Sequence, residues 1–417
     1  MTTSGADPGV RRWLRGRGPQ ASDARVVAFS AIAMTMTLFG QTPGVAVFVN
    51  ALVADLGLDR SQVSAAYAVG TLGSAFLLPL IGRRMDLVGV RRMTLLIAAG
   101  YGCSMVLLGS AQGFLWLLPG FVGVRLLGQG ALGLAGRNAV TLHFRVGLGR
   151  AVAISGSVAA LASSTGPFVL AGAIASIGWR ETWVAAALSV WVVVIPATLL
   201  LLPRGDRGAA PAAVATPAAG EAVPWTRARA LRSRMFWLVT LANAVGAVIL
   251  TGFAFLQISV LGEAGLSASA AAAMFIPLTI ASVGFLAVVA PLAGRWSTRA
   301  IVVAAMTPLV LAMLLVPFLG GSFAPLLYAA ALGAGLGAGQ VLDGILYPRH
   351  FGVHAIGAIR SAAFTVVASA SAAGPVVVGF VHDLTGGYAT AALVLVTLPI
   401  AVIASAFLVR MPSTPAD

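Results

Sequence analysis

Arg125 is the residue of this sequence best placed to bind a charged ligand. It lies near the middle of an apolar run of residues, 114–138. A guanidinium at that depth of a membrane costs at least about 3 kcal/mol unless it faces a partner or a polar cavity. An arginine can bind a carboxylate through two parallel hydrogen bonds. The position predicts a role in substrate binding or proton coupling, with a structural hydrogen bond to a neighbouring helix as the alternative.

Five further polar side chains inside apolar runs are candidates for the transport pathway. Four are amides and one is an acid: Gln41, Asn243, Gln257, Gln340 and Asp343. Asp343 is the only carboxylate in the interior of any of these runs, and a proton-coupled carrier needs a titratable group there. Asp343 is therefore the proton-coupling candidate by elimination. His350 and His354 are interpreted as loop residues, and the single cysteine, Cys103, is interpreted as a small core residue, so no metal site is expected.

The elements that carry these residues are predicted to be membrane-spanning helices. Hydrophobic residues make up 59% of the chain and charged residues 9%, whereas a soluble domain has about 25% charged residues. Apolar runs long enough to span a bilayer lie near 26–50, 61–81, 93–111, 114–138, 151–173, 181–202, 235–260, 268–290, 300–319, 322–345, 358–381 and 388–409. The sequence thus predicts an all-α membrane protein with twelve transmembrane helices.

The arginines predict how the chain is oriented. All 26 basic residues are arginine, and all but Arg60, Arg125 and Arg180 fall in the tails, in the loops on the N-terminal side of the membrane or at the adjoining helix ends. The positive-inside rule then predicts both termini in the cytoplasm and a location in the cell inner (plasma) membrane. Because the positive charge lies between the spans, nucleic-acid binding is not expected.

An internal repeat divides the chain into two halves. Residues 203–234 are rich in Ala, Pro, Gly and Arg and have no apolar face, so they are predicted to be a cytoplasmic linker between the bundles 26–202 and 235–410. Residues 1–25 and 411–417 are predicted to be cytoplasmic tails. Gly82-Arg83, His143-Phe144 and Gly166-Pro167 each recur roughly 210 residues later, as Gly294-Arg295, His350-Phe351 and Gly374-Pro375. Duplicated six-helix halves are typical of transporters that work by alternating access.

The segment after the second predicted span carries a family signature, Gly82-Arg83-Arg84-Met85-Asp86-Leu87-Val88-Gly89-Val90-Arg91-Arg92. It resembles the loop motif of the major facilitator superfamily, G-x-x-x-D-R-x-G-x-[RK]-[RK], except that Leu87 replaces the usual Arg. The resemblance implies a cytoplasmic gate, in which Asp86 accepts hydrogen bonds from the start of span eleven or pairs with an arginine. The gate candidates are Asp86, Gly82, Gly89, Arg91, Arg137 and Arg360. The alternative is that the arginines only follow the charge bias.

Span four also resembles the superfamily. Arg125-Leu126-Leu127-Gly128-Gln129-Gly130 is similar to its R-x-x-x-Q-G pattern, and spans one, four, seven and ten line the central cavity in this family. The pathway residues implied are Arg125, Gln41, Gln129, Asn243, Gln257 and Gln340. Each amide has the alternative of bonding a neighbouring helix.

A narrower resemblance concerns the substrate. Residues 346–361 are similar to a loop in bacterial relatives of the monocarboxylate and oxalate/formate carriers. This implies secondary transport of a small organic anion, with proton coupling left open and Arg125 as the anion-binding group. Two alternatives stay open: proton-antiport efflux of drugs or metabolites, suggested by Gly166-Pro167, and a membrane sensor that transports nothing. The ATP-binding pattern G-x-x-x-x-G-K-[ST] does not occur. We expect a monomeric carrier in the lipid bilayer, with no cofactor and no enzymatic activity.

Overall fold

A computed structural model describes residues 21–144, 148–203, 225–293, 295–352 and 356–408. Most of the predicted N-terminal tail, the predicted C-terminal tail and most of the predicted linker lie outside these ranges, whereas residues 21–25 of the predicted tail form the start of the first helix. Within them, regular structure is entirely helical. Twelve of the helical segments are long and apolar enough to cross a membrane, so the predicted all-helical, twelve-span fold is confirmed. Large apolar side chains such as Leu188, Leu200 and Leu311 are exposed on these helices, as expected of surfaces that face lipid.

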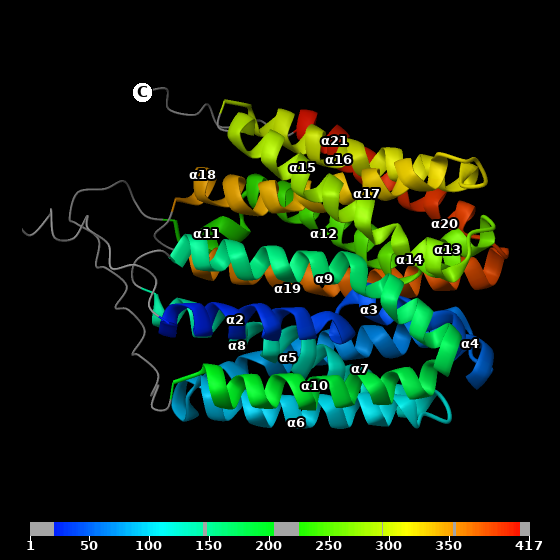
Figure 1. The fold of residues 1–417 in the computed structure, drawn as a ribbon. Helices are drawn as coiled ribbons and strands as arrows, with labels where there is room; N and C mark the ends of the chain where they lie inside the picture. The colour runs from blue at the N-terminus through cyan, green and yellow to red at the C-terminus, as the bar shows by residue number, and fades with distance from the viewer. Residues whose placement is uncertain (1–20, 145–147, 204–224, 294, 353–355, 409–417) are drawn as a thin grey trace, which may run out of the picture.

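The helices form two bundles that lie side by side (Figure 1). The N-terminal half contains α2 (Ala21–Met36), η1 (Thr37–Gly40), α3 (Thr42–Ala46), α4 (Val49–Leu56), α5 (Arg60–Val88), α6 (Val90–Gly109), α7 (Phe114–Gly123), η2 (Val124–Leu132), α8 (Gly133–His143), α9 (Leu148–Ile177) and α10 (Trp179–Leu201). The C-terminal half contains α11 (Arg227–Leu231), α12 (Arg234–Phe255), α13 (Gln257–Glu263), α14 (Ala268–Ala273), α15 (Phe275–Ala293), α16 (Thr298–Leu315), η3 (Val316–Phe318), α17 (Ala324–Val341), η4 (Leu342–Leu346), α18 (Tyr347–Phe351), α19 (Ile356–Thr385), α20 (Tyr388–Leu395) and α21 (Thr397–Leu408).

All spans run between the same two ends of the molecule. We call the end where α2 begins and α10 and α21 finish the linker end, and the opposite end, which holds α4 and α13, the far end (Figure 1, left and right). Short local signals begin and end the helices at these surfaces. The Ser233 hydroxyl accepts a hydrogen bond from the Phe236 amide at the start of α12, 3.1 Å away. Gly89 ends α5 with φ 90°, a conformation that side chains with a Cβ rarely adopt.

Two spans contain wider, π-helical turns. One is η2, in the middle of the fourth span, and the other is η4, in the tenth span. Such turns are rare and often occur at functional sites, because the extra residue in the turn changes the direction of the neighbouring side chains. η2 carries Arg125 and Gln129, and η4 carries Asp343. Both irregular turns therefore carry residues that the sequence singles out.

Candidate substrate cavity

The largest cavity described here, about 670 Å³, lies between the two halves. The N-terminal half contributes residues of α5, η2 and α8, and the C-terminal half contributes residues of α12 and α19. The lining consists of Thr71, Ser74, Ala75, Leu78, Pro79, Gly82, Arg125, Gln129, Gly130, Leu134, Arg137, Ala247, Phe364, Val367, Ala368 and Ser371. Among the described residues it includes two arginines and several hydroxyls but no carboxylate. The cavity is therefore positively charged along its N-terminal wall and largely apolar along the opposite wall.

Arg125 is held at this cavity by contacts that leave its charge unneutralised. Its Nη1 donates a hydrogen bond to the Gly40 carbonyl at 3.1 Å, and its guanidinium carbon lies 4.8 Å from the centre of the Tyr67 ring. The residue is only 6% exposed, and its Nε has no hydrogen-bond partner. No described carboxylate forms an ion pair with it. A buried guanidinium with a free donor favours an anionic ligand, because a lone buried charge is costly.

Gln129 and Arg137 extend the same wall toward the linker end. Both are exposed and line the cavity with Arg125. Arg137 lies on α8, about three helical turns beyond Arg125 along the span. At that separation the two arginines would meet an entering anion one after the other rather than together. The second positive charge would raise the local concentration of anions at the mouth of the cavity.

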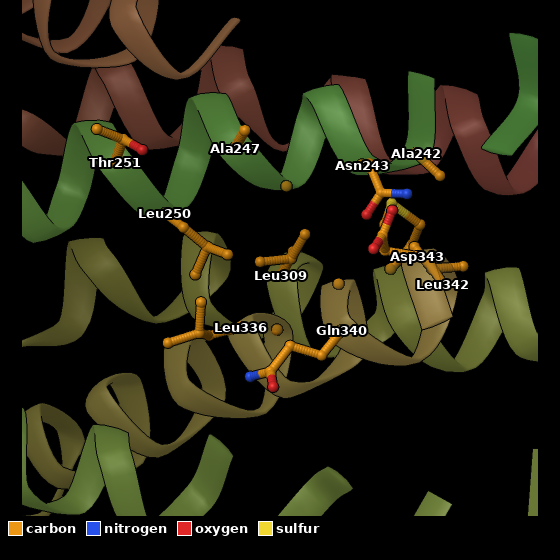
Figure 2. Close-up of a pocket in the computed structure, with 14 residues that line it drawn as sticks. Ala242, Asn243, Ala247, Leu250, Thr251, Leu309, Leu336, Gln340, Leu342 and Asp343 are labelled. Carbon is orange, nitrogen blue, oxygen red and sulfur yellow. The ribbon is translucent and has the colours of Figure 1, made fainter. Parts of the chain in front are cut away.

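A second cavity, of about 330 Å³, lies in the C-terminal half between α12, α16 and α17 (Figure 2). It contains the polar residues Asn243, Gln340 and Asp343. Figure 2 shows Asn243 of α12 and Asp343 of η4 turned toward each other, with Gln340 turned away from both. The Asp343 carboxylate pairs with Arg360, and the Arg360 Nη2 also donates to the Asp343 carbonyl at 2.9 Å. With 55% of its side chain exposed, Asp343 is open to solvent rather than buried.

A third cavity, of about 260 Å³, is lined by α3 and α9 of the N-terminal half and by α12, α15 and α17. Gln41 lies on its wall, where its Oε1 accepts a hydrogen bond from the Ser163 hydroxyl at 2.9 Å. This cavity shares Leu250, Thr251 and Leu336 with the second cavity, so the two are adjacent. The second and third cavities are thus lined by Gln41, Asn243 and Gln340, and the 670 Å³ cavity is lined by Arg125 and Gln129.

Gln257 does not line any of these three cavities. It is fully buried, and its Nε2 donates to the Ala271 carbonyl at 3.3 Å. That contact joins α13 to the residues of α14 in the same half. The position corresponds to the alternative in which an amide bonds a neighbouring helix.

The gate candidates occupy different surroundings at the linker end. Gly82 lines the largest cavity, and Gly89 ends α5. The Arg91 Nη2 donates to the Leu199 carbonyl of α10 at 3.0 Å, so this contact remains within the N-terminal half. Arg360 pairs with Asp343 within the C-terminal half. The Asp86 side chain lies outside the described part of the structure.

The contacts that close the far end were not anticipated from the sequence. Hydrogen bonds join the halves at this end: the Ser61 amide donates to Asp383 Oδ2 at 2.9 Å, and the Ser259 hydroxyl donates to Asn50 Oδ1. Deeper in the molecule, the rings of Tyr67 and Phe255 pack with centroids 4.2 Å apart. The described structure is therefore closed at the far end, with its largest cavity reaching toward the linker end.

Comparison with known proteins supports the fold. Residues 27–375 match the family model described as Major Facilitator Superfamily. No curated protein matches the chain significantly. A bacterial homolog of the human lysosomal transporter Spinster, inward-facing and unoccupied, superposes with a TM-score of 0.75 at 16% identity, covering 94% of this chain and 97% of that chain. The nucleoside transporter NupG superposes with a TM-score of 0.74 at 11% identity, covering 93% of this chain and 99% of that chain. At these identities the superpositions show a shared fold.

Proposed function

The chain belongs to the Major Facilitator Superfamily and is a multi-pass membrane transporter rather than an enzyme, and we propose that it moves a small organic anion by alternating access. In this mechanism the two six-helix halves rock about a central site, which is open to one side of the membrane at a time. The proposal places the linker end in the cytoplasm of a cell whose inner (plasma) membrane holds the protein as a monomer. The substrate then enters or leaves the described state through the linker end.

The observation that carries the anion proposal is the unneutralised charge of Arg125. The residue is 6% exposed, lines the largest cavity and has no described carboxylate as a partner. A substrate carboxylate would supply the missing partner through a bidentate pair. The facing wall, with Phe364 and Val367, offers apolar surface to the remainder of the substrate. The cavity therefore suits an anion that has an apolar part.

Substitution of Arg125 by lysine tests this assignment. Arg125→Lys keeps the positive charge but loses the planar pair of donors. We expect substrate affinity to fall by roughly tenfold to a hundredfold, the loss expected for a charge-assisted hydrogen bond. The cognate ligand is first identified by thermal shift, screening purified protein against monocarboxylates, sugars and hydrophobic cations, because a ligand that binds only the folded state raises its stability. Affinity is then measured by titration calorimetry.

The matched control is Arg180→Lys. Arg180 donates to the Ala111 carbonyl at 2.7 Å and pairs with Asp55 at the far end, away from the cavities. Its lysine variant should bind the ligand like the wild type. Unchanged affinity in Arg125→Lys would remove Arg125 from the binding site and the anion proposal with it. A hydrophobic cation as the only ligand would favour the efflux alternative, and binding without substrate-driven counterflow in proteoliposomes would favour a sensor.

A further inference from the structure

The two long helices that pair across the halves end with the same short pattern. α5 ends with Asp86-Leu87-Val88-Gly89, and α19 ends with Asp383-Leu384-Thr385-Gly386. Both glycines have positive φ, 90° and 75°. α5 runs from the far end to the linker end, and α19 runs in the opposite direction. The two aspartates therefore lie at opposite ends of the molecule, each at the end where the other helix begins.

At the far end, Asp383 is bonded to the first turn of α5. Its Oδ2 accepts a hydrogen bond from the backbone amide of Ser61, the second residue of that helix, at 2.9 Å. The backbones are close there, because a Cβ on Gly379 of α19 would lie 3.2 Å from both the Arg60 carbonyl carbon and the Ser61 nitrogen. A carboxylate at a helix N-terminus is stabilised by the unpaired amides and by the helix dipole.

A histidine holds the Asp383 side chain in place. The Nε2 of His382 lies 2.6 Å from Glu263 Oε1, and its Nδ1 lies 3.4 Å from Asp383 Oδ1. The His382 side chain is 10% exposed and packs against the Tyr388 ring, with centroids 4.3 Å apart. Glu263, His382, Asp383 and Tyr388 all belong to the C-terminal half. Ser61 belongs to the opposite half, as does Arg60, whose charge acts on Tyr388.

The hydrogen bond to Ser61 is not needed to begin α5. The N-cap residue Asp59 and Gln62 form a capping box within the helix, in which the Asp59 amide donates to Gln62 Oε1 at 3.0 Å. That local cap can persist whether the halves are together or apart. The Asp383 contact forms only when the far end is closed. A contact present in one state and absent in the other shifts the balance between them.

We infer that Asp383 is a positioning residue of the transport cycle: it latches the far end shut by binding the N-terminus of α5. This rests on the proposed alternating-access function. The sequence predicts Asp86 as its counterpart, which would bind the start of α19 when the linker end closes. The repeated Asp-Leu-x-Gly pattern thus encodes one latch for each end of a single helix pair. Because the two halves rock about a central site, only one of the two latches is formed at a time.

Spin-label distances in Asp383→Asn test the latch. Asparagine keeps the shape of the side chain but loses the charge. Labels on Ala54 and Ala268 report the far end, and labels on Leu142 and Ala300 report the linker end, in a Cys103→Ser background because Cys103 is exposed. Each pair has one label in each half. We expect the ratio of far-closed to far-open molecules to fall about tenfold, because the asparagine oxygen can still accept from Ser61 but the bond is no longer charge-assisted.

The matched control is Asp55→Asn. Asp55 is also a paired carboxylate at the far end, but its partner, Arg180 at 2.7 Å, belongs to the same half. The Asp55→Asn variant should leave the distance distributions of both label pairs unchanged. Wild-type distributions in Asp383→Asn, or an equal shift in Asp55→Asn, would overturn the latch. The measurement uses the whole protein without substrate, so a wrong anion assignment leaves this result intact, and a failed latch leaves the Arg125 titration intact.

Discussion

At the scale of single residues, the surroundings of the arginines separate binding from structural roles. Arg180, Arg299 and Arg349 donate to backbone carbonyls at helix ends, as in the 2.6 Å contact between Arg349 Nη2 and the Ala293 carbonyl. Such contacts satisfy carbonyls that a helix end leaves without an intrahelical partner. Arg125 also donates to a carbonyl, but it lies at mid-span on a cavity wall and keeps a free Nε. We therefore expect an anionic ligand to bind to the Nε of Arg125.

The sequence could single out the charged residues but not their partners. Asp343 and Arg125 stand out because few charges occur within apolar runs. The pairing of Asp343 with Arg360 depends on how η4 turns at the end of its span, and no local pattern encodes that direction. Gln257 and Gln41 are both glutamines inside apolar runs of the sequence. In the structure, however, the Gln257 side chain is fully buried among other residues. Burial and orientation of single side chains follow from tertiary packing.

Asp343 remains the proposed proton-coupling residue, and Asp343→Asn tests it. A proton on Asp343 would weaken its pair with Arg360 and so link protonation to the movement of η4 and α19. We expect the variant to exchange substrate across proteoliposomes at about the wild-type rate, since exchange needs no net proton movement. A pH gradient should no longer drive accumulation above the equilibrium level. The measurement compares counterflow with pH-driven uptake of the ligand identified by thermal shift.

The control for this prediction is Asp55→Asn, which removes an exposed carboxylate without touching a cavity. It should accumulate substrate like the wild type. Full pH-driven accumulation in Asp343→Asn would assign the proton coupling to another residue. Loss of both exchange and accumulation would show that Asp343 is needed for the cycle itself rather than for coupling.

At the scale of elements, the apolar runs predicted the membrane spans well, but the π-helical turns could not be predicted from the sequence. The second span was predicted at 61–81 and is Arg60–Met85 in the structure. The sixth was predicted at 181–202 and is Trp179–Leu201. Length and hydropathy determine such spans directly. The π-helical turns η2 and η4 occur in segments whose composition resembles the neighbouring helix. They depend on contacts with other helices, which the hydrophobic period does not contain.

One of these contacts gives a prediction about the position of η2. A Cβ on Gly40 would lie 2.2 Å from the Val124 carbonyl oxygen and 2.9 Å from the Gln129 nitrogen, so only glycine lets the first span approach η2 this closely. Gly40→Ala must push η2 away and move Arg125 with it. We expect a loss of about 1–3 kcal/mol in stability, as for other overpacked sites, together with weaker ligand binding. Thermal unfolding and titration calorimetry measure the two effects.

Gly172→Ala provides the comparison for Gly40→Ala. Gly172 is also a helical glycine, in α9, but nothing lies within 4 Å of the Cβ that alanine would add. Its substitution should leave affinity unchanged and stability within about 0.5 kcal/mol of the wild type. If Gly40→Ala behaved in the same way, the close approach would not be what positions Arg125.

At the scale of the whole molecule, the sequence predicted two halves and one orientation, but not a conformational state. The repeat and the linker indicate the halves, and the twelve spans follow from hydropathy. Which end is closed depends on a few contacts across the halves, such as Ser61 with Asp383 and Tyr67 with Phe255. An alternating-access protein is built to form and break these contacts, so its sequence must be compatible with both states. The closed far end is therefore information that only the structure supplies.

The arginine bias makes one prediction about the molecule as a whole, which is its orientation in the membrane. Arg83, Arg84 and Arg92 are exposed at the linker end, and the positive-inside rule places that end in the cytoplasm. In a Cys103→Ser background, an impermeant thiol reagent added to intact cells should label Ala54→Cys, at the far end, but not Arg207→Cys or Thr414→Cys. Permeabilising the cells should expose all three, because the reagent then reaches both faces of the membrane. Labelling of Thr414→Cys in intact cells would show that the topology is the reverse of the predicted one. The cavity described here would then open to the outside.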